Sequence, residues 1–202
     1  KPLIAHSILQ AQKAGCFDAI GVSSDSDEIL RIAEEYGVKF LIKRPTDMAT
    51  NTAPKLPVIR HAVENLEKQS GLIADFCVDL DATSPLRNTS DILGAIALLR
   101  EHEGDNVITG TPSHRSPYFN LVELDQFGIA HLSKPSTVSR RQDAPSCFDM
   151  NASIYVWKRK ALMSNPSLFC ETTRLFSMPQ ERSLDIDSEL DFELVNFLMT
   201  RD

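Results

Sequence analysis

Three Asp-x-Asp pairs are the clearest candidates for metal chemistry in this 202-residue sequence: Asp25–Asp27, Asp79–Asp81 and Asp185–Asp187. In an extended segment, residues i and i+2 point to the same side, so each pair can present two carboxylates to one hard cation. The first pair stands where a helix is expected to begin, and we interpret it as a helix cap. The other two stand at the ends of expected strands, where α/β proteins bind ligands.

A second candidate is the paired guanidinium of Arg140-Arg141, because arginine holds carboxylate or phosphate oxygens in a bidentate fashion. A solvated run of charges is the alternative, and the residues alone leave both open. The histidines have no ligand spacing, so we assign none of them to a site. Without a G-x-S-x-G elbow or a C-x-x-C pair, the sequence favours neither a serine hydrolase nor a zinc knuckle.

Alternating helices and strands must position these side chains. The pattern predicts an α/β fold with a Rossmann-like, mostly parallel sheet flanked by helices, and ligands bound outside the carboxyl ends of the strands. Apolar residues at helical spacing indicate helices over 2–14, from 27 to Gly37, from Leu56 to Leu66 and from Asp91 onward, and buried-strand patterns occur at 17–22, 38–42, 76–81 and 106–111.

The alternation of helices and strands changes after these elements. Segments 118–124 and 129–132 flank a turn and predict an antiparallel β-hairpin, which we interpret as a dimerisation arm. A polar stretch over 133–150 follows it. Further strands are expected at 153–157 and 175–178. A last helix is expected from about Ser188, with Leu190, Leu194, Phe197 and Leu198 facing inward.

Composition and net charge limit the kinds of partner that the protein is expected to bind. The net charge is -7, which is the wrong sign for broad binding to a phosphate backbone, so we expect no nucleic-acid partner. No apolar run approaches the roughly 18 residues that span a bilayer, and no signal-peptide pattern opens the sequence. The widely separated cysteines fit reduced thiols. We therefore expect a soluble, cytoplasmic protein without a membrane partner.

Several segments, taken in order, resemble the acylneuraminate cytidylyltransferases, which are the CMP-sialic acid synthetases and their nonulosonic-acid relatives. The resemblance runs over nearly the whole chain. It is carried by Lys1-Pro2-Leu3-Ile4, Ser23–Ile29, Arg44-Pro45, Thr83-Ser84-Pro85-Leu86-Arg87, Arg141-Gln142-Asp143 with Asn151 eight residues later, Tyr155, and Asp185-Ile186-Asp187.

The resemblance implies a magnesium-dependent enzyme of the sugar-nucleotidyltransferase fold that joins CTP to a nonulosonic acid and releases pyrophosphate. It implies a homodimer formed through the hairpin arm, with residues 1–202 as one cytidylyltransferase domain and 113–150 as arm and substrate loop. The implied nucleotide contacts are Arg44, Thr52 and Thr83. The implied substrate contacts are Asp81, Ser84, Arg141, Gln142, Asn151 and Tyr155. The implied catalytic metal ligands are Asp185 and Asp187, with Asp81 as a further candidate.

The sequence departs from the family pattern in two ways, and other functions are therefore kept as alternatives. The family begins with a strand and a Gly-Ser-Lys loop that cradles the triphosphate, and this sequence starts downstream of both. A catalytically silent nucleotide- or sugar-binding module is therefore one alternative. A metal-dependent glycosyltransferase is another, because those enzymes also use Asp-x-Asp beside a nucleotide-binding sheet. Asp81 stands where the sialic acid branch commonly has glutamine, and resembles instead a metal-binding aspartate of the Kdo cytidylyltransferase branch. A CMP-Kdo-type synthetase is the third alternative.

Overall fold

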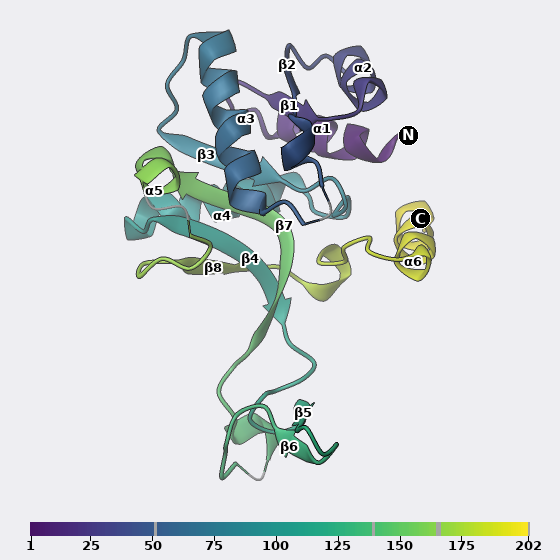
Figure 1. Ribbon diagram of the computed structural model, residues 1–202, viewed down its shortest axis with the longest axis vertical. Helices are drawn as coiled ribbons and strands as arrows, with labels where there is room; N and C mark the ends of the chain where they lie inside the picture. The colour runs from purple at the N-terminus through teal and green to yellow at the C-terminus, as the bar shows by residue number, and fades with distance from the viewer. Residues whose placement is uncertain (51, 139, 165–166, 202) are drawn as a thin grey trace.

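The computed structural model describes residues 1–50, 52–138, 140–164 and 167–201, and confirms an α/β fold. Figure 1 shows a body of helices packed on strands, a hairpin arm that projects from it, and a C-terminal helix that stands beside it. The elements of the first half are α1 (Leu3–Ala14), β1 (Gly21–Ser24), α2 (Asp27–Glu35), β2 (Phe40–Lys43), the 3-10 turn η1 (Thr46–Met48), α3 (Lys55–Ser70), β3 (Phe76–Leu80), α4 (Thr89–His102) and β4 (Asn106–Pro112).

The second half contains the arm and the remaining strands. Its elements are β5 (Val122–Leu124), β6 (Ala130–Leu132), the 3-10 turn η2 (Arg141–Asp143), β7 (Phe148–Lys158), α5 (Arg159–Ser164), β8 (Arg174–Ser177), the 3-10 turn η3 (Gln180–Arg182) and α6 (Glu189–Thr200). The interpretation of Asp25–Asp27 as the cap of α2 is wrong, because the residue between them, Ser26, is the cap and accepts a hydrogen bond from the amide of Ile29, while the Asp27 carboxylate pairs with Lys43. No helix in the described ranges is both long and apolar enough to cross a bilayer.

The expected mostly parallel sheet is wrong, because the sheets are mixed. β1 pairs with β2 in parallel, and a second sheet has the order β3-β7-β4-β8. Within it, β7 runs antiparallel to both β3 and β4, and only β4 and β8 are parallel. The reason is that β4 leads directly into the arm and the chain returns as β7, so that Pro112 pairs with Phe148 at the base of the arm. β4 and β7 are thus the two sides of one long hairpin.

Helices cover both faces of the larger sheet. Alternate residues of β7 point to opposite faces, so Ile154 and Val156 pack against α4 while Tyr155 and Trp157 pack toward α3 and α5. A third apolar cluster joins α1 and α2 to β1. This arrangement buries β7 in the centre of the molecule and leaves its ends to position polar residues.

The predicted β-hairpin is confirmed. β5 and β6 pair antiparallel, with Val122 opposite Leu132, and Gly128 adopts a positive φ of 79° in the connecting turn. The side chain of Asp125 accepts hydrogen bonds from the amides of Phe127 and Ile129, which stabilises the turn. Apolar side chains are nevertheless exposed on the arm, with Phe127 79% and Leu124 69% accessible.

The prediction that α6 buries Leu190, Leu194 and Phe197 is wrong. Leu190 is 72% exposed, Phe197 58% and Leu194 42%, whereas Val195 is the buried residue of this helix. The physical reason is visible in Figure 1, where α6 stands apart from the body and has little surface to pack against. Helical spacing of apolar residues reports an apolar face, but it does not report what covers that face.

An ion pair anchors the segment that leads to the last Asp-x-Asp pair. Asp91, in the first turn of α4, accepts two hydrogen bonds from the guanidinium of Arg182, at 2.9 and 2.8 Å. It also accepts from the amide of Asn88 at 2.9 Å and so completes a capping box. The Asp91 side chain is 3% exposed. η3 is therefore held against the start of α4.

We predict that Asp91→Asn lowers the free energy of unfolding by about 2 kcal/mol, because hydrogen bonds to a charged group are worth more than neutral ones and the Arg182 guanidinium loses its counter-charge. Urea unfolding at neutral pH measures this change. Glu101→Gln, at an exposed site in the last turn of the same helix, is the matched control and should leave stability nearly unchanged. Equal stabilities of the two variants would contradict the anchoring role.

A second ion pair ties α5 to α3. Glu67 accepts hydrogen bonds from Arg159 at 2.6 and 2.9 Å and from the amide of Ala74 at 3.1 Å. The hydrogen bond from the Arg159 guanidinium is the main reason that the pKa of Glu67 lies below its ordinary value of 4.5. A depressed pKa means that the charged form stabilises the fold above the unfolded-state pKa, and that this contribution is lost as the pH falls through the folded-state value.

We therefore predict that Glu67→Gln lowers the melting temperature at neutral pH, and that the difference from the parent shrinks as the pH falls below the ordinary value of 4.5 and through the lowered folded-state pKa. Thermal unfolding followed by circular dichroism across this range measures the effect. The control is Glu64→Gln, at an exposed position of the same helix. A difference that stays constant with pH would show that Glu67 does not act through its charge.

Candidate functional site

A cavity of about 500 Å³ lies between α1 and α3 and reaches the carboxyl ends of β1 and β3. In the described chain, β1 pairs only with β2 and β3 only with β7, and residues of both strands line this cavity. Its deeper part is apolar. Its polar end carries Ser23, Arg44, Lys55, Asp79 and Asp81. The end at which ligands were expected from the strand pattern is therefore the polar end of a real cavity.

Asp81 follows β3, and protein donors engage both of its carboxylate oxygens. Oδ2 accepts a hydrogen bond from Lys55 Nζ at 2.7 Å, and Oδ1 accepts from the Thr83 hydroxyl at 3.1 Å and the Thr83 amide at 3.4 Å. Burial alone would raise the pKa of Asp81, but the Lys55 ammonium and the Thr83 donors outweigh it and lower that pKa. The predicted residues Asp81 and Thr83 are therefore in contact, and Asp81 stays charged.

Lys55 joins Asp81 to Asp79 and Tyr155. Its Nζ lies 3.3 Å from Asp79 Oδ2 and 4.4 Å from the centroid of the Tyr155 ring. That Asp79 oxygen is inaccessible to solvent and has no well-formed hydrogen bond. Burial raises the pKa of Asp79, although the nearby ammonium opposes the shift. Burial acts to lower the pKa of Lys55, and the two carboxylates more than offset it, so that this pKa is raised.

Tyr155 is 2% exposed and stacks on Trp157, with ring centroids 5.4 Å apart. Burial also raises the pKa of its hydroxyl. The Tyr155 ring adjoins the polar end of the cavity through its contact with Lys55, and it does not form an open surface there. Its implied contact with a sugar stays a prediction.

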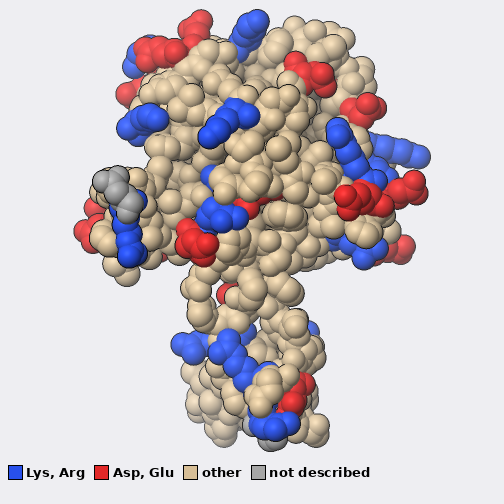
Figure 2. All heavy atoms as spheres, turned by 180° about the vertical axis from the view of Figure 1, so that it is seen from behind, with Lys and Arg blue, Asp and Glu red and all other residues tan. Residues whose placement is uncertain are grey.

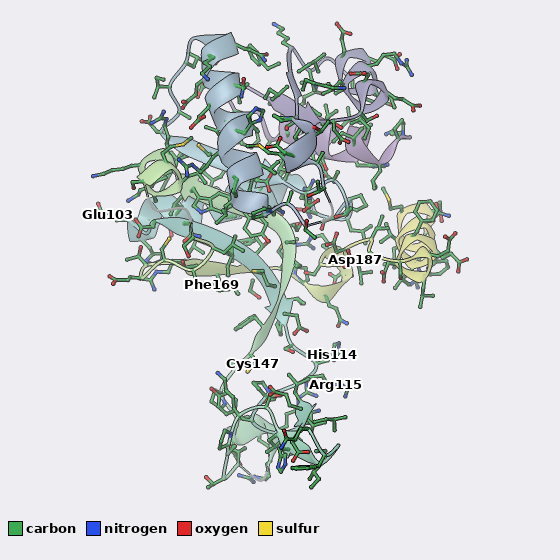
Figure 3. The ribbon with its side chains drawn as sticks, in the orientation of Figure 1. Glu103, His114, Arg115, Cys147, Phe169 and Asp187 are labelled. Atoms are coloured by element: carbon green, nitrogen blue, oxygen red, sulfur yellow. The ribbon has the colours of Figure 1, made fainter. Side chains whose placement is uncertain are left out.

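The Thr83-Ser84 turn lies against the last Asp-x-Asp pair. Ser84 is fully buried, and its hydroxyl donates to Asp185 Oδ1 at 3.2 Å. The Ile186 amide donates to the Thr83 carbonyl at 3.0 Å, so backbone contacts hold the two segments together. Asp187 is exposed, on the segment that leads to α6 (Figure 3). Residues about 100 positions apart in the sequence thus meet at one place.

Asn151 lies in the same region, where its side chain cross-links two segments of the chain. Its side-chain oxygen accepts from the Thr109 hydroxyl at 2.7 Å, and its side-chain nitrogen donates to the Ser183 hydroxyl at 3.0 Å. Its carbonyl lies 3.5 Å from the Ser84 hydroxyl. Asn151 is 6% exposed, so its amide ties the centre of the sheet to the segment just before Asp185.

Of the implied nucleotide contacts, Arg44 lies at the carboxyl end of β1 and Thr52 before α3, whereas Thr83 follows β3. The Arg44 guanidinium donates to the Ser23 carbonyl at 2.8 Å, and its amide donates to the Ser24 carbonyl at 2.9 Å, which holds it at the carboxyl end of β1. Thr52 is exposed, in the turn before α3, with its hydroxyl 3.4 Å from that of Thr50. Arg44 and Thr50 line the cavity.

Arg141 and Gln142 lie in the arm, apart from the other predicted residues. Both are exposed in η2, and Arg141 donates to the Ser113 carbonyl at 3.2 Å. Figure 3 shows the base of the arm, marked by His114, Arg115 and Cys147, as a narrow connection below the sheet. Within one chain, the structure therefore does not bring these two residues to the Asp81 and Asp185 region.

Two cations of the site were not among the predicted residues. Arg87 is 2% exposed and donates to the Ser153 carbonyl at 3.0 Å and to the Ser7 hydroxyl. Burial lowers its pKa to about 10, against the carboxylates of Asp81, Asp79 and Asp185, so it remains charged at neutral pH. Its position in the Thr83–Arg87 segment was the available signal. Lys55 gave a weaker signal, because it is a cation in the first turn of a helix, where the helix dipole disfavours a positive charge.

In the described residues, the carboxylates that could bind a metal occur as pairs. In the described part of the chain, no group of three or more His, Cys, Asp or Glu side chains gathers closely enough to hold an ion. Asp185 uses one carboxylate oxygen for Ser84 and the Ile186 amide, and Asp187 is open to solvent. Such a pair fits Mg²⁺, which usually takes one or two carboxylates and completes its shell with water and substrate phosphates.

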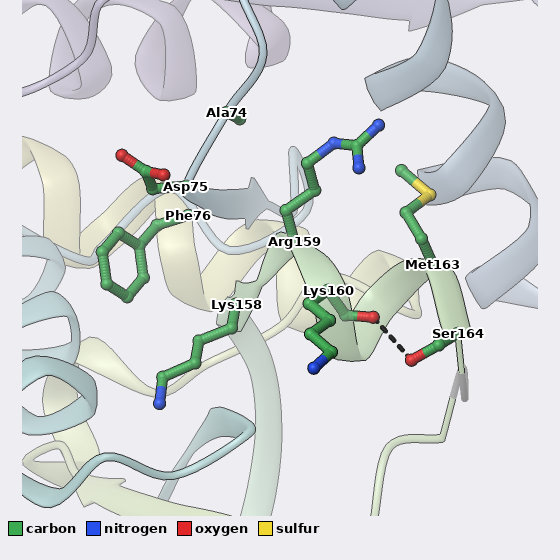
Figure 4. Close-up of a pocket in the computed structure, with 8 residues that line it drawn as sticks. All are labelled: Ala74, Asp75, Phe76, Lys158, Arg159, Lys160, Met163 and Ser164. Carbon is green, nitrogen blue, oxygen red and sulfur yellow. Dashed lines mark hydrogen bonds between the residues drawn. The ribbon is translucent and has the colours of Figure 1, made fainter.

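A second hollow of about 680 Å³ lies at the opposite end of β3, beside α5 (Figure 4). Lys158, Arg159 and Lys160 line it. Lys158 is bound to the Glu103 carbonyl at 2.9 Å and Arg159 to Glu67, so two of these cations are already engaged. Figure 2 shows charged side chains of both signs scattered over the back of the body, without one basic patch.

Comparison with known proteins identifies the family of this chain. The family model described as "Cytidylyltransferase" matches residues 1–189. The chain is 44% identical over 197 residues to post-translational flagellin modification protein B of Campylobacter coli, covering 98% of this chain and 83% of that protein. It is 43% identical over 198 residues to CMP-N,N'-diacetyllegionaminic acid synthase of Campylobacter jejuni subsp. jejuni, covering 98% and 84%.

The fold is shared with more distant structures. The structure of CMP:2-keto-3-deoxy-manno-octonic acid synthetase complexed with CTP superposes with a TM-score of 0.69 at 16% identity, covering 98% of this chain and 88% of that one. A crystal structure of 4-diphosphocytidyl-2C-methyl-D-erythritol synthase gives a TM-score of 0.65 at 14% identity, covering 98% and 90%. The family match over residues 1–189 and the relatives above 40% identity lead to one conclusion: this chain belongs to the cytidylyltransferase family.

Proposed function

We propose that this protein activates a nonulosonic acid of the legionaminic or sialic type with CTP, forming the CMP-sugar and pyrophosphate. The observation that carries the proposal is 43% identity over 98% of the chain to a CMP-N,N'-diacetyllegionaminic acid synthase. The contact between the Thr83-Ser84 turn and Asp185 supports it, because it places hydroxyl and carboxylate groups together at the carboxyl end of β3. We further propose that residues 1–202 act as one catalytic unit.

In the proposed reaction, the anomeric hydroxyl of the sugar attacks the α-phosphorus of CTP and pyrophosphate leaves. Asp185 and Asp187 would hold Mg²⁺, which neutralises charge that develops on the phosphoryl oxygens. Arg44, held at the carboxyl end of β1, would contact the nucleotide together with Thr52 and Thr83. Thr83 and Ser84 are fixed by Asp81 and Asp185, so their positions are set before substrate binds.

The sugar carboxylate needs a fixed cation, and we assign this role to Arg141 with Gln142 as its neighbour. Arg141 belongs to the 113–150 segment, of which residue 139 lies outside the described part. Because the arm carries Arg141 away from the cavity of its own chain, we propose that the arm joins two chains in a homodimer. Exposed Leu124 and Phe127 supply the apolar surface that such an interface needs.

We predict that Asp187→Asn reduces pyrophosphate release from CTP by about a hundredfold in the presence of a diacetylated legionaminic acid, because loss of metal neutralisation is worth several kcal/mol and each tenfold corresponds to about 1.4 kcal/mol. The exposed Glu193→Gln in α6 is the matched control and should retain the parent rate. Retention of more than about a tenth of parent activity by Asp187→Asn would count against the metal role. N-acetylneuraminate and Kdo as acceptors identify the branch of the family.

We predict a homodimer at micromolar concentration, measured by sedimentation equilibrium. The double variant Leu124→Asp/Phe127→Asp should raise the dissociation constant at least about tenfold, because it places two charges in an apolar interface. The control is Ile73→Asp/Phe169→Asp, which makes the same changes at residues 70% and 68% exposed on the body. A parent that sediments as a monomer, or two double variants that behave alike, would remove the arm from the interface.

A further inference from the structure

Lys55 occupies the space between the two carboxylates of the Asp79-Leu80-Asp81 segment. Its Nζ lies 2.7 Å from Asp81 Oδ2 and 3.3 Å from Asp79 Oδ2, and the Tyr155 ring covers it from a third side at 4.4 Å. The Lys55 side chain is 34% exposed, and the side chains of Asp81 and Asp79 are 30% and 28% exposed. Two anions and an aromatic face form the kind of cage that binds an ammonium group.

The position of Lys55 has no explanation in the stability of its own helix. Lys55 is the first residue of α3, and a positive charge at that end opposes the helix dipole. Pro54 precedes it without a side-chain hydrogen bond to cap the helix. The interactions that hold the ammonium therefore come from β3, the turn after β3, and β7, and not from α3.

A divalent ion and the Lys55 ammonium compete for the same place. A metal bound to both Oδ2 atoms has to lie about 2.0–2.6 Å from each of them, which is the volume that Nζ occupies. Asp81 Oδ1 offers no second route, because the hydroxyl and amide of Thr83 already bind it. A second cation this close to an ammonium is repelled, most strongly away from bulk water.

We propose that Lys55 is the permanent counter-cation of Asp79 and Asp81, which excludes divalent metal from this pair and fixes Asp81 against Thr83. Lys55 is thus a positioning residue. One consequence is that Mg²⁺ is left to Asp185 and Asp187, and this consequence rests on the proposed function. It assigns to Asp81 a role in orienting the mouth of the cavity, and it removes Asp81 from the metal ligands.

The test is a titration of the whole protein with Mn²⁺, without nucleotide or sugar, followed by electron paramagnetic resonance of the free ion. We expect Lys55→Met to create a Mn²⁺ site at least about tenfold tighter than any site of the parent, because it uncovers two converging carboxylates and keeps the aliphatic stem. The site should vanish in Lys55→Met/Asp81→Asn. Lys55→Arg, which keeps the charge, should not gain it, nor should Lys160→Met at an exposed lysine on α5.

Two results would overturn the inference. One is a parent that already binds Mn²⁺ with an affinity that falls in Asp81→Asn and not in Asp187→Asn. The other is a folded Lys55→Met variant, as judged by circular dichroism, that gains no Mn²⁺ site. Because the titration needs no turnover, it decides the role of Lys55 even if the parent forms no CMP-sugar, which is the result that would defeat the proposed function alone.

Discussion

Charge compensation at the carboxyl end of β3 is the constraint on which the candidate site depends. Asp79, Asp81 and Asp185 lie in a region where water is partly excluded, and the cations that face them are Lys55 and the buried Arg87. A buried charge without a partner costs several kcal/mol, so these groups hold one another in place. They come from β3, the loop between β3 and α4, the first turn of α3 and the segment before α6, and the site therefore exists only when these parts of the chain are packed.

This compensation also links the layers of the molecule. Arg87 connects α1 to β7 through Ser7 and Ser153, and Lys55 connects α3 to β3. Further along the chain, Arg182 is anchored on Asp91 and Ser183 on Asn151, so the segment before Asp185 is fixed from two sides. The position of the last Asp-x-Asp pair is thus an outcome of contacts made by residues outside it.

The long hairpin of β4 and β7 separates two parts of the proposed chemistry. It carries Thr109 and Asn151 beside the site, and Arg141 in the arm, where the guanidinium donates to the Ser113 carbonyl just beyond β4. In one chain, the arm and α6 both expose apolar side chains, among them Phe127 at 79% and Leu190 at 72%. Exposed apolar surfaces of this kind often mark interaction sites, and the surface on the arm is the one that the proposed dimer interface would bury.

Local pattern in the sequence determined the helices α1 to α4, the hairpin and the α/β class, because helical spacing, caps and turn residues act over a few positions. It placed the first strand at 17–22, whereas pairing with β2 forms the strand at Gly21–Ser24. The order of motifs also named Thr83, Ser84 and Asp185, which do meet. The direction of β7, the exposure of α6 and the position of Lys55 between Asp79 and Asp81 were decided by tertiary structure alone. Lys55 meets Asp81 across 26 positions and Arg87 meets Ser7 across 80, and contacts between residues so far apart leave no period or spacing in the sequence.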